Sequence, residues 1–237
     1  MSVLLIDIGN SRLKWQLRND HGDCQSGAVD KDNAARFAWP AGPEQVLVAS
    51  VRDNTELHQL FSDLYGPRLH WLSAPVPEYP DFQHCYPLPQ RLGVDRWLAM
   101  LGARRLFSGD LLVVDSGTAL TVDLLSHSNE HQGGYIVPGL MMARAALFGG
   151  TDKVRQFDDE ADQLSLAPGR NTVNCVAAGT LRQHVALVKS VMAEYPDHRL
   201  LVTGGDGEAL AELLGSVSYP DLIFDGMDSL CAGLFTA

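Results

Sequence analysis

The hydrophobic pattern of this chain starts from two continuous apolar runs, one near the N-terminus and one near the middle. The runs cover residues 3–6 and 111–114, and each leads into an aspartate that is followed two positions later by a glycine. Apolar runs of this kind predict buried strands. After the first run, large apolar residues alternate with polar ones over residues 12–18, which predicts a second strand that forms a hairpin with the first.

The rest of the chain alternates between strand-like and helix-like patterns. We expect further strands at 24–29, 44–50, 69–72, 119–125, 133–137 and 199–203, and helices at 55–64, 94–107, 140–147, 172–194, 207–214 and 226–235. The apolar face expected for helix 94–107 consists of Trp97, Leu98, Leu101 and Leu106. Strands followed by helices in both halves predict an α/β fold with mixed sheets and flanking helices, and not a helical bundle or a sandwich.

Three segments lack a periodic pattern. Residues 73–90 are rich in proline but also carry aromatic side chains, so we expect an ordered loop that leads into a site instead of a plain linker. Residues 149–170 are acidic and irregular, which predicts a mobile loop. The polar segment 126–134 contains His127 and His131 and is typical of a hairpin tip, so we do not expect metal binding there.

The two Asp-x-Gly turns are the strongest internal repeat. Asp7–Asn10 and Asp115–Thr118 both place a carboxylate at the end of a strand, then a glycine that allows close backbone approach, then a small polar side chain. For one copy alone, a simple hairpin turn explains the pattern as well. Two copies, each opening a new α/β half, favour a duplicated fold that binds a polyanion, with halves at 1–109 and 110–237.

Composition and charge narrow the class of protein. The chain has 237 residues, 46% of them hydrophobic, and a net charge of −11, which argues against nucleic acid or an anionic membrane as a partner. No apolar stretch reaches the length of a membrane span, and the N-terminal residues do not resemble a signal peptide, so we expect a cytoplasmic protein. Cys24, Cys85, Cys175 and Cys231 are widely spaced, which favours neither disulfides nor a zinc site.

A second candidate for chemistry is the segment Gly93–Arg96 (GVDR), at the junction of the proline-rich loop and a predicted helix. A carboxylate and a guanidinium at a helix N-terminus suit proton transfer together with anion binding. The alternative is helix capping, because an acidic residue in the first turn complements the helix dipole.

The order and spacing of Tyr86, Gly93–Arg96 and Asp115–Thr121, together with the first turn at Asp7–Lys14, resemble type III pantothenate kinases. These belong to the superfamily of acetate and sugar kinases, Hsp70 and actin. The resemblance covers nearly the whole chain. It implies two similar actin-like ATPase halves of the ribonuclease H type and the activity of an ATP:pantothenate 4′-phosphotransferase, the first step of coenzyme A synthesis.

The resemblance also implies roles for individual residues. Asp95 would be the catalytic base, and Asp115 would bind a monovalent cation, potassium or ammonium. Asp7 would hold Mg²⁺ through water. Contacts with ATP would come from Asp7, Ile8, Gly9, Asn10, Ser11, Arg12, Leu13, Lys14 and Thr118. Contacts with pantothenate would come from Tyr86, Gly93, Val94, Asp95, Arg96 and Thr172. The resemblance further implies a homodimer, with no nucleic acid or membrane partner.

The chemistry of phosphoryl transfer agrees with these roles. The chain has neither a P-loop nor the motif set of protein kinases, and its phosphate turns hold few cations, so metal ions would have to offset the charge of ATP. Lys14 is equally explained as a phosphate contact or as a solvated strand residue. Two rival functions stay open: another small-molecule kinase of the superfamily, and a non-catalytic regulator of the Bvg accessory factor type.

Overall fold

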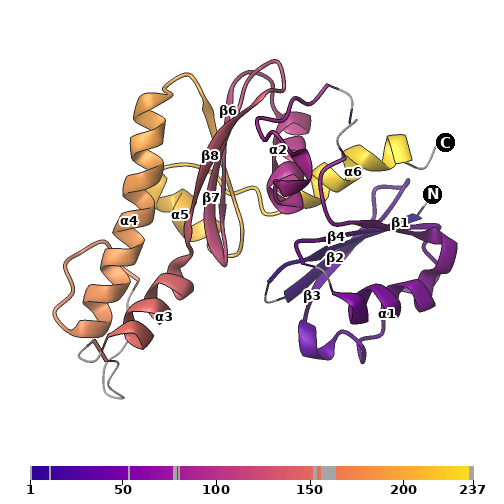
Figure 1. Cartoon of the computed structure of the whole chain (residues 1–237), viewed down its shortest axis with the longest axis horizontal. Coiled ribbons are helices and arrows are strands. Elements are labelled where there is room, and N and C mark those ends of the chain that lie inside the picture. Colours follow the sequence, from indigo (N-terminus) through magenta and orange to yellow (C-terminus); the bar gives the residue numbers. More distant parts are fainter. Residues whose placement is uncertain are drawn as a thin grey trace. The chain divides into compact units, whose positions relative to one another are not determined.

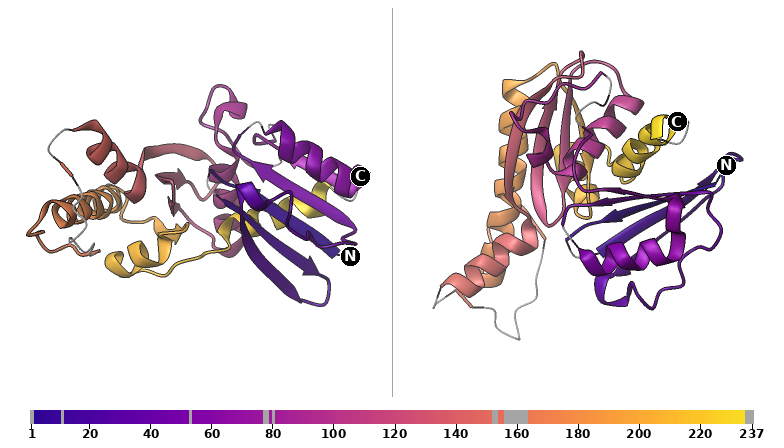
Figure 2. Two further views of the ribbon diagram at one scale, coloured as in Figure 1. Left: turned by 90° about the horizontal axis from the view of Figure 1, so that it is seen from below. Right: turned by 45° about the vertical axis from the view of Figure 1, so that its right-hand side comes forward.

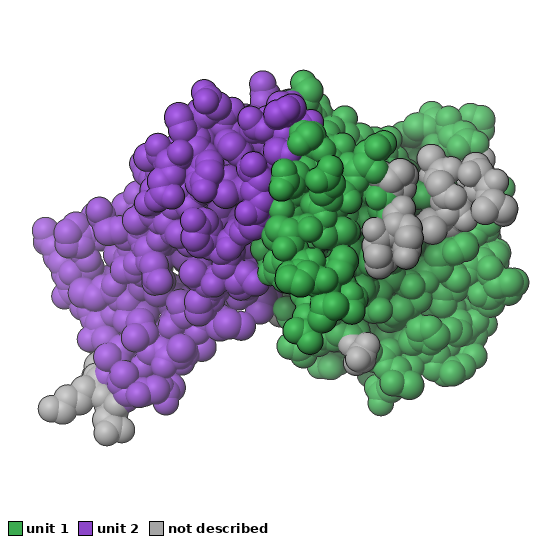
Figure 3. All heavy atoms as spheres, turned by 45° about the horizontal axis from the view of Figure 1, so that its top comes forward, with its two compact units in different colours: residues 1–108, 128–131, 221–237 green, residues 109–127, 132–220 purple. Residues whose placement is uncertain are grey.

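The computed structural model describes residues 2–10, 12–52, 54–76, 79, 81–151, 154–155 and 164–234, with the side chains of 232–234 excepted. The chain divides into two compact units. Unit 1 contains residues 1–108, 128–131 and 221–237, and unit 2 contains residues 109–127 and 132–220. Figure 3 colours the two units separately.

Unit 1 is built on a five-stranded mixed sheet in the order β3-β2-β1-β4-β5. Its strands are β1 (Ser2–Ile8), β2 (Arg12–Asn19), β3 (Cys24–Asp30), β4 (Gln45–Ser50) and β5 (Leu69–Leu72). Its helices are α1 (Thr55–Tyr65), α2 (Val94–Leu106) and α6 (Leu222–Leu234), with short 3₁₀ turns at Lys31–Asn33, Gly66–Arg68 and Pro89–Arg91. The first three strands form an antiparallel meander. Strand β4 runs parallel to β1, and β5 runs parallel to β4.

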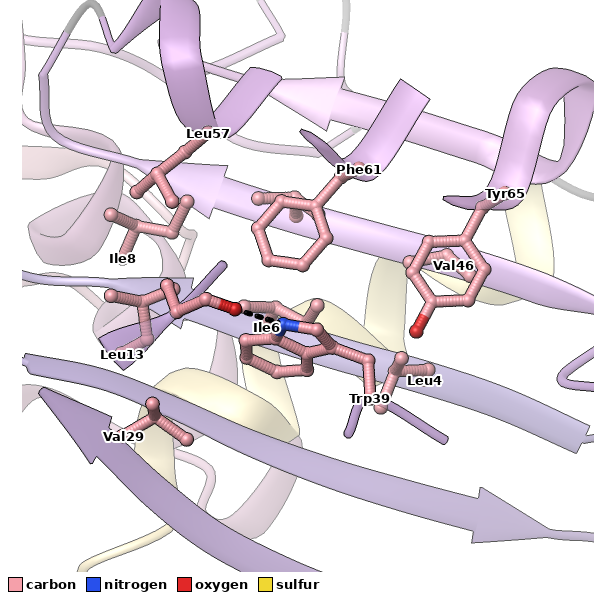
Figure 4. Packing of buried hydrophobic residues seen from close by; sticks show 12 residues of the cluster. Leu4, Ile6, Ile8, Leu13, Val29, Trp39, Val46, Leu57, Phe61 and Tyr65 are labelled. Carbon is pink, nitrogen blue, oxygen red and sulfur yellow. Dashed lines mark hydrogen bonds between the residues drawn. The ribbon is translucent and has the colours of Figure 1, made fainter. Parts of the chain in front are cut away.

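Alternate residues of β1 point to opposite faces of this sheet, and both faces are covered. Leu4, Ile6 and Ile8 lie in a buried cluster with α1, whose side chains Leu57, Phe61 and Tyr65 point onto the strand (Figure 4). Trp39 completes the cluster, and its indole N–H donates to the carbonyl of Ala34 at 2.9 Å. The opposite face of the sheet packs against α2 and α6. Burial on both sides explains why β1 is a continuous apolar run.

Unit 2 repeats this plan with a four-stranded sheet in the order β8-β7-β6-β9. Its strands are β6 (Leu111–Ser116), β7 (Ala119–Leu125), β8 (His131–Pro138) and β9 (Arg199–Thr203). Its helices are α3 (Leu140–Gly150), α4 (Thr172–Glu194) and α5 (Gly207–Leu214) (Figure 1). As β1 does in unit 1, β6 pairs antiparallel with the next strand and parallel with the strand after the meander. The predicted mixed α/β fold and its two hairpins are therefore confirmed.

The last helix packs in unit 1, although it follows the whole of unit 2 in the sequence (Figures 1 and 2). A Cβ on Gly102 of α2 would collide with the carbonyl of Leu222, and one on Gly226 of α6 would collide with the carbonyl of Leu98. The two helices thus touch backbone to backbone at paired glycines. The sequence predicts two halves that meet at residues 109 and 110. In the structure, residues 128–131 and 221–237 also belong to unit 1, although they follow residue 109 in the sequence.

Two local predictions need correction. Leu106, expected on the apolar face of α2, is 43% exposed because the helix ends there and turns away from its covered side. His131, expected in a hairpin tip, is the first residue of β8 and is completely buried. Of the acidic segment expected to be a mobile loop, residues 152–153 and 156–163 lie outside the described residues, and residues 149–150 belong to α3. Within the part of the chain that the structure describes, we find no helix both long and apolar enough for a membrane span.

Candidate active site

The first phosphate-type turn joins β1 to β2. The Gly9 N–H donates to the carbonyl of Arg12 at 3.1 Å, which closes the turn around Asn10. Ser11, which the sequence analysis included among the ATP contacts, lies outside the described residues. Ile8 and Leu13 are buried in the core, so only their backbone is available to a ligand. Arg12 is exposed and forms a surface ion pair with Asp30 at 3.1 Å.

Asp7 lies just before this turn, on the sheet face that packs against α2 and α6. Its side chain is only 8% exposed. Lys14 is its direct partner across the antiparallel β1–β2 pair, so the two side chains project from the same face with Cβ atoms about 4.5–5.5 Å apart. A cation is therefore positioned beside a largely buried carboxylate. This arrangement favours the interpretation of Lys14 as part of a charged site.

The second turn joins β6 to β7 and is one residue shorter. The Gly117 N–H donates to the carbonyl of Ala119 at 2.9 Å. Asp115 precedes it and is half-buried, and Thr118 at the tip is exposed. Asp115 points away from α4, because its neighbours Val114 and Ser116 alternate with it and Val114 packs against that helix. Asp115 and Asp7 thus occupy equivalent places in the two sheets.

Two glycines from other segments of unit 2 pack against this second turn. Gly204 follows β9 with a φ of +98°, and a Cβ on it would collide with Asp115 Oδ1 and the carbonyl of Ser116. Gly139 follows β8, and its N–H donates to the carbonyl of Thr118 at 3.0 Å. The backbone at Gly204 and Gly139 therefore packs directly against the Asp115 turn. This packing restricts the turn, which carries carboxylate, hydroxyl and carbonyl oxygen atoms.

The oxygen donors at both turns fit the metal ions that the resemblance implies. Carboxylate, hydroxyl and carbonyl oxygens are the ligands preferred by Mg²⁺ and by alkali cations, and neither turn offers the thiolates or imidazoles that favour zinc. Asp7 would hold Mg²⁺ and Asp115 a monovalent cation. Either ion, when bound, would neutralise negative charge on a phosphate ester.

The N-terminus of α2 carries the Gly93–Arg96 segment. Asp95 is half-buried, and its Oδ1 accepts the backbone N–H of Arg96 at 2.8 Å. A Cβ on Gly93 would lie 2.5 Å from that same oxygen. Glycine at position 93 thus leaves room for the carboxylate to fold back over the start of the helix. Capping and catalysis are compatible, because a carboxylate can accept about four hydrogen bonds.

Arg96 is buried and points toward the proline-rich loop. Its Nη1 donates to the Tyr86 hydroxyl at 3.0 Å, and its guanidinium carbon lies 5.9 Å from the centre of the Tyr86 ring. The Tyr86 ring in turn stacks on His131, with ring centres 6.0 Å apart and planes 21° from parallel. Unit 1 therefore brings together Tyr86, Asp95 and Arg96, which are three of the predicted substrate contacts.

Thr172, the remaining predicted substrate contact, lies in unit 2. It is the first residue of α4, behind the N-cap Asn171, whose side chain accepts the N–H of Asn174 at 2.8 Å. Thr172 lines a groove of about 630 Å³ between the start of α4 and the end of α3. The groove is lined by Leu147, Val154, Gly169, Arg170, Asn171, Thr172, Cys175, Val176, Gly179, Thr180 and Gln183.

Comparison with known families decides the class of protein. A profile of type III pantothenate kinases matches residues 3–194. The chain belongs to the type III pantothenate kinase family. A type III pantothenate kinase of Pseudomonas fluorescens (strain Pf0-1) is 36% identical over 246 residues, which cover 97% of this chain and 98% of that relative.

Solved structures agree on the fold. A protein of Campylobacter jejuni, assigned to the Baf family of transcriptional activators, superposes with a TM-score of 0.68 at 24% identity, over 99% of this chain and all of that one. The activator of 2-hydroxyisocaproyl-CoA dehydratase from Clostridium difficile, with bound ADPNP, gives a TM-score of 0.53 at 11% identity, over 100% of this chain and 98% of that one. At these identities the likeness shows the fold alone, which is the actin-like α/β fold expected from the sequence.

Sequence reasoning missed two residues of the site. Gly204 was not among the predicted site residues, but it packs on Asp115. The sequence signal that could have identified it is the Gly204-Gly205 pair directly after the strand that ends at Thr203. His131 carries no local signal at all, because its contacts with Cys85 and Tyr86 come from a loop far away in sequence.

Proposed function

We propose that this protein transfers the γ-phosphoryl group of ATP to the 4′-hydroxyl of pantothenate. The observation that carries the proposal is the buried Arg96 at the start of α2, held by Tyr86 and next to the Asp95 carboxylate. A guanidinium fits a carboxylate substrate in a bidentate manner. The family membership of the chain supplies the substrate, and the described side chains supply a partner for its carboxylate and a base for its hydroxyl.

In the proposed reaction, Arg96 binds the pantothenate carboxylate and Tyr86 restricts the guanidinium to one orientation. The pantothenate hydroxyl oxygen attacks the γ-phosphorus, its proton passes to Asp95, and the bond to the β-phosphate oxygen breaks to release ADP. The turn from Asp7 to Lys14 and the Thr118 hydroxyl would contact ATP. Such a transfer needs positioning and charge neutralisation more than covalent help.

The proposal includes dependence on a monovalent cation. ATP brings about four negative charges, the residues proposed to bind it and its metal ions include the carboxylates Asp7 and Asp115, and Mg²⁺ offsets only two negative charges. Like charges brought together in a partly dry site repel strongly unless another cation lies between them. We therefore propose that potassium or ammonium binds at Asp115 and activates the enzyme, while sodium does so poorly.

The decisive test is a coupled assay of ADP release with pantothenate, acetate and sugars as alternative acceptors, at constant ionic strength with and without potassium. We expect turnover with pantothenate alone, and a potassium-dependent rate. Asp95→Asn should lower kcat by about 10²–10⁴-fold, because it removes the general base. Asp63→Asn, an exposed carboxylate on α1, is the matched control and should behave as wild type. Turnover of another acceptor, or none, would contradict the proposal.

One observation keeps a regulatory role in view. The Campylobacter jejuni protein of the same fold is described as a transcriptional activator. A protein that only bound a ligand would have no evident need for Asp7, Asp95 and Asp115 together. An Asp95→Asn variant that kept full regulatory effect in cells but lost turnover would separate the two roles. The cytoplasmic location expected from the sequence stays a prediction.

We also propose that the protein is a homodimer. Five large apolar side chains are exposed on β8 and α3: Tyr135, Ile136, Met141, Met142 and Leu147. Exposed large apolar side chains on consecutive elements favour a protein interface in this part of the chain. Sedimentation at micromolar concentration should give twice the chain mass of 25.8 kDa. Met141→Glu should shift the equilibrium toward the monomer, and a wild-type monomer would refute the dimer.

A further inference from the structure

Unit 1 contains a thiol–imidazole pair that has no task in phosphoryl transfer. Cys85 Sγ lies 3.2 Å from His131 Nδ1. Cys85 is exposed, whereas His131 is completely buried. The sulfur is therefore accessible to reagents in solution, while the base beside it is shielded from water. A nucleophile within hydrogen-bond reach of an oriented base is the arrangement that activates cysteine.

The orientation of His131 is fixed by its neighbours. Its backbone N–H donates to the carbonyl of Gln83 at 2.9 Å, and the Gln83 N–H donates to the carbonyl of Asn129 at 3.0 Å, so the loop and the strand are held together. On one side of the imidazole lies the ring of Tyr86, nearly parallel to it. These contacts hold the Nδ1 atom toward Cys85.

The charges around the pair favour a thiolate. Arg96 donates to the hydroxyl of Tyr86, whose ring stacks on His131. Burial lowers the pKa of His84, the residue before Cys85, and electrostatic interaction with His131 lowers it further. The His131 Nδ1 atom beside the sulfur can accept the thiol proton, and the imidazolium formed in this way stabilises a thiolate on Cys85.

The other cysteines provide comparisons within the same chain. Cys24 and Cys175 are also exposed, but their sulfurs lie 3.9 Å from the carbonyl of Gln25 and 3.3 Å from the carbonyl of Gly169. A carbonyl accepts the S–H and favours the thiol form, unlike an imidazole. Cys231 is buried, and burial raises the pKa of its thiol to about 12. Among the described residues, Cys85 is thus the cysteine whose sulfur lies within hydrogen-bond distance of an imidazole nitrogen, whereas the sulfurs of Cys24, Cys175 and Cys231 contact backbone carbonyls.

We propose that Cys85 is a modification site that exchanges with low-molecular-weight disulfides, and that the resulting mixed disulfide weakens binding of the carboxylate substrate. The Cys85 S–H proton passes to His131 Nδ1, and the thiolate attacks one sulfur of the reagent. A Cys85–S–S–R bond forms as the reagent's own S–S bond breaks. The leaving thiolate takes the proton from the imidazolium, and a second thiol reverses the exchange.

The predicted effect on substrate binding follows from Tyr86. An added group on Cys85 breaks the Sγ–Nδ1 contact and crowds His131. Tyr86 stacks on His131, and the Tyr86 hydroxyl in turn orients the Arg96 guanidinium. This second half of the proposal rests on the proposed function, whereas the reactivity of Cys85 does not.

Reactivity is measured on the wild-type protein by limited treatment with iodoacetamide at pH 7, followed by mass spectrometry of the cysteine peptides. We expect Cys85 to be alkylated roughly tenfold faster than Cys24 and Cys175. Oxidised glutathione should form its adduct at Cys85 first. Equal rates at the three exposed cysteines would overturn the proposal, and this comparison needs no variant that must fold.

His131→Phe keeps a flat ring for Tyr86 to stack on but removes the base. In a variant with wild-type circular dichroism, Cys85 should react no faster than Cys24, and an unchanged rate at Cys85 would overturn the role of His131. His127→Phe replaces an exposed histidine of the adjacent turn and is the matched control. It should leave the rate of alkylation of Cys85 unchanged.

The effect on function is measured as KM for pantothenate after treatment with oxidised glutathione. We expect KM to rise several-fold, with KM for ATP little changed, and dithiothreitol to restore it. Cys85→Ser should abolish the sensitivity. An adduct at Cys85 with unaltered pantothenate kinetics would overturn the proposal that modification of Cys85 weakens substrate binding. No pantothenate turnover by the untreated enzyme would instead contradict the proposed function and leave the labelling result standing.

Discussion

At the scale of single residues, Gly93 is required for space. Its φ of −57° and ψ of 131° suit any amino acid, but a Cβ would lie 2.5 Å from Asp95 Oδ1. The carboxylate is the far end of a short side chain, so it can move aside without unfolding the helix. Glycine at this position therefore determines where the proposed base lies.

Gly93→Ala should impair the reaction without destabilising the fold. Displacement of a reacting group by about 1 Å can cost about 10²-fold in rate, so we expect a fall of that order in kcat. Thermal unfolding should be nearly unchanged, since alanine tolerates this backbone conformation. Steady-state kinetics and a melting curve check both parts. A kcat within threefold of wild type would mean that the position of Asp95 is not critical.

Gly204 and Gly205 form a natural pair for a second test. Gly204 has a positive φ and no room for a Cβ beside Asp115, whereas a Cβ on Gly205 would meet open space. Gly204→Ala should cost about 1–3 kcal/mol in unfolding free energy and abolish activation by potassium. Gly205→Ala should retain both. The measurements are chemical denaturation and initial rate against potassium concentration, and equal behaviour of the two variants would refute the role of Gly204.

Individual site residues could be predicted where their role is local. Asp7, Asp115 and Asp95 stand at strand or helix ends, and such positions are legible in sequence. His131 could not be recognised, because nothing near it marks a buried strand residue. It contacts Cys85, which lies 46 residues earlier in the chain, and single-sequence patterns do not report such contacts.

At the scale of elements, most strands and helices were predicted, because their apolar residues follow a period of two or run without interruption. The start of α6 was placed at Gly226, four residues late. Gly226 looked like a boundary, since glycine weakens helices, yet it lies inside the helix where the backbone of α2 approaches. Glycine in a helix can thus indicate close packing and not an end.

The α2–α6 contact makes a sharp prediction. Gly102→Ala would force a methyl group into the carbonyl of Leu222, and overpacking of this kind costs about 1–3 kcal/mol or more. Gly179→Ala on α4 is the control: a Cβ there meets nothing, and alanine favours a helix by up to about 1 kcal/mol. Denaturant unfolding should show opposite signs for the two variants. A neutral Gly102→Ala would mean that the helices can separate freely.

At the scale of the whole molecule, the charge network of unit 1 adds to this contact. Arg18 of β2 lies 3.2 Å from Asp225 and 3.5 Å from Asp228, and Arg105 of α2 also pairs with Asp228. Gln16 donates to Asp221 at 2.6 Å. One polar row on β2 thus fastens α6 to the sheet. The sequence could not reveal this, because partners about two hundred residues apart leave no local pattern.

Stability should fall in strong alkali for a specific reason. Burial raises the pKa of Tyr65 from 10.0 to about 12, and its hydroxyl donates to the carbonyl of Pro40. The folded state therefore holds the proton more tightly than the unfolded chain. This contribution is complete below pH 10 and is lost between pH 10 and about 12.

Tyr65→Phe should accordingly be less stable than wild type at pH 7, by about 0.5–1.5 kcal/mol for the lost hydrogen bond, but should lose less stability above pH 10. Tyr135→Phe, an exposed tyrosine, is the control and should follow the wild-type curve. Urea unfolding at pH 7 to 12 measures the slopes. Parallel curves for wild type and Tyr65→Phe would show that another group is responsible.

The attachment of α6 to unit 1 also has a consequence for synthesis. A ribosome makes the five strands of the first sheet early, but it must then make all of residues 109–220 before the helix that covers one face of that sheet. At about 5–20 residues per second, this interval lasts on the order of ten seconds. During that time an apolar sheet face on the nascent chain has α2 but lacks α6, the second of its covering helices. Chaperone capture of the growing polypeptide should therefore peak while unit 2 is being translated.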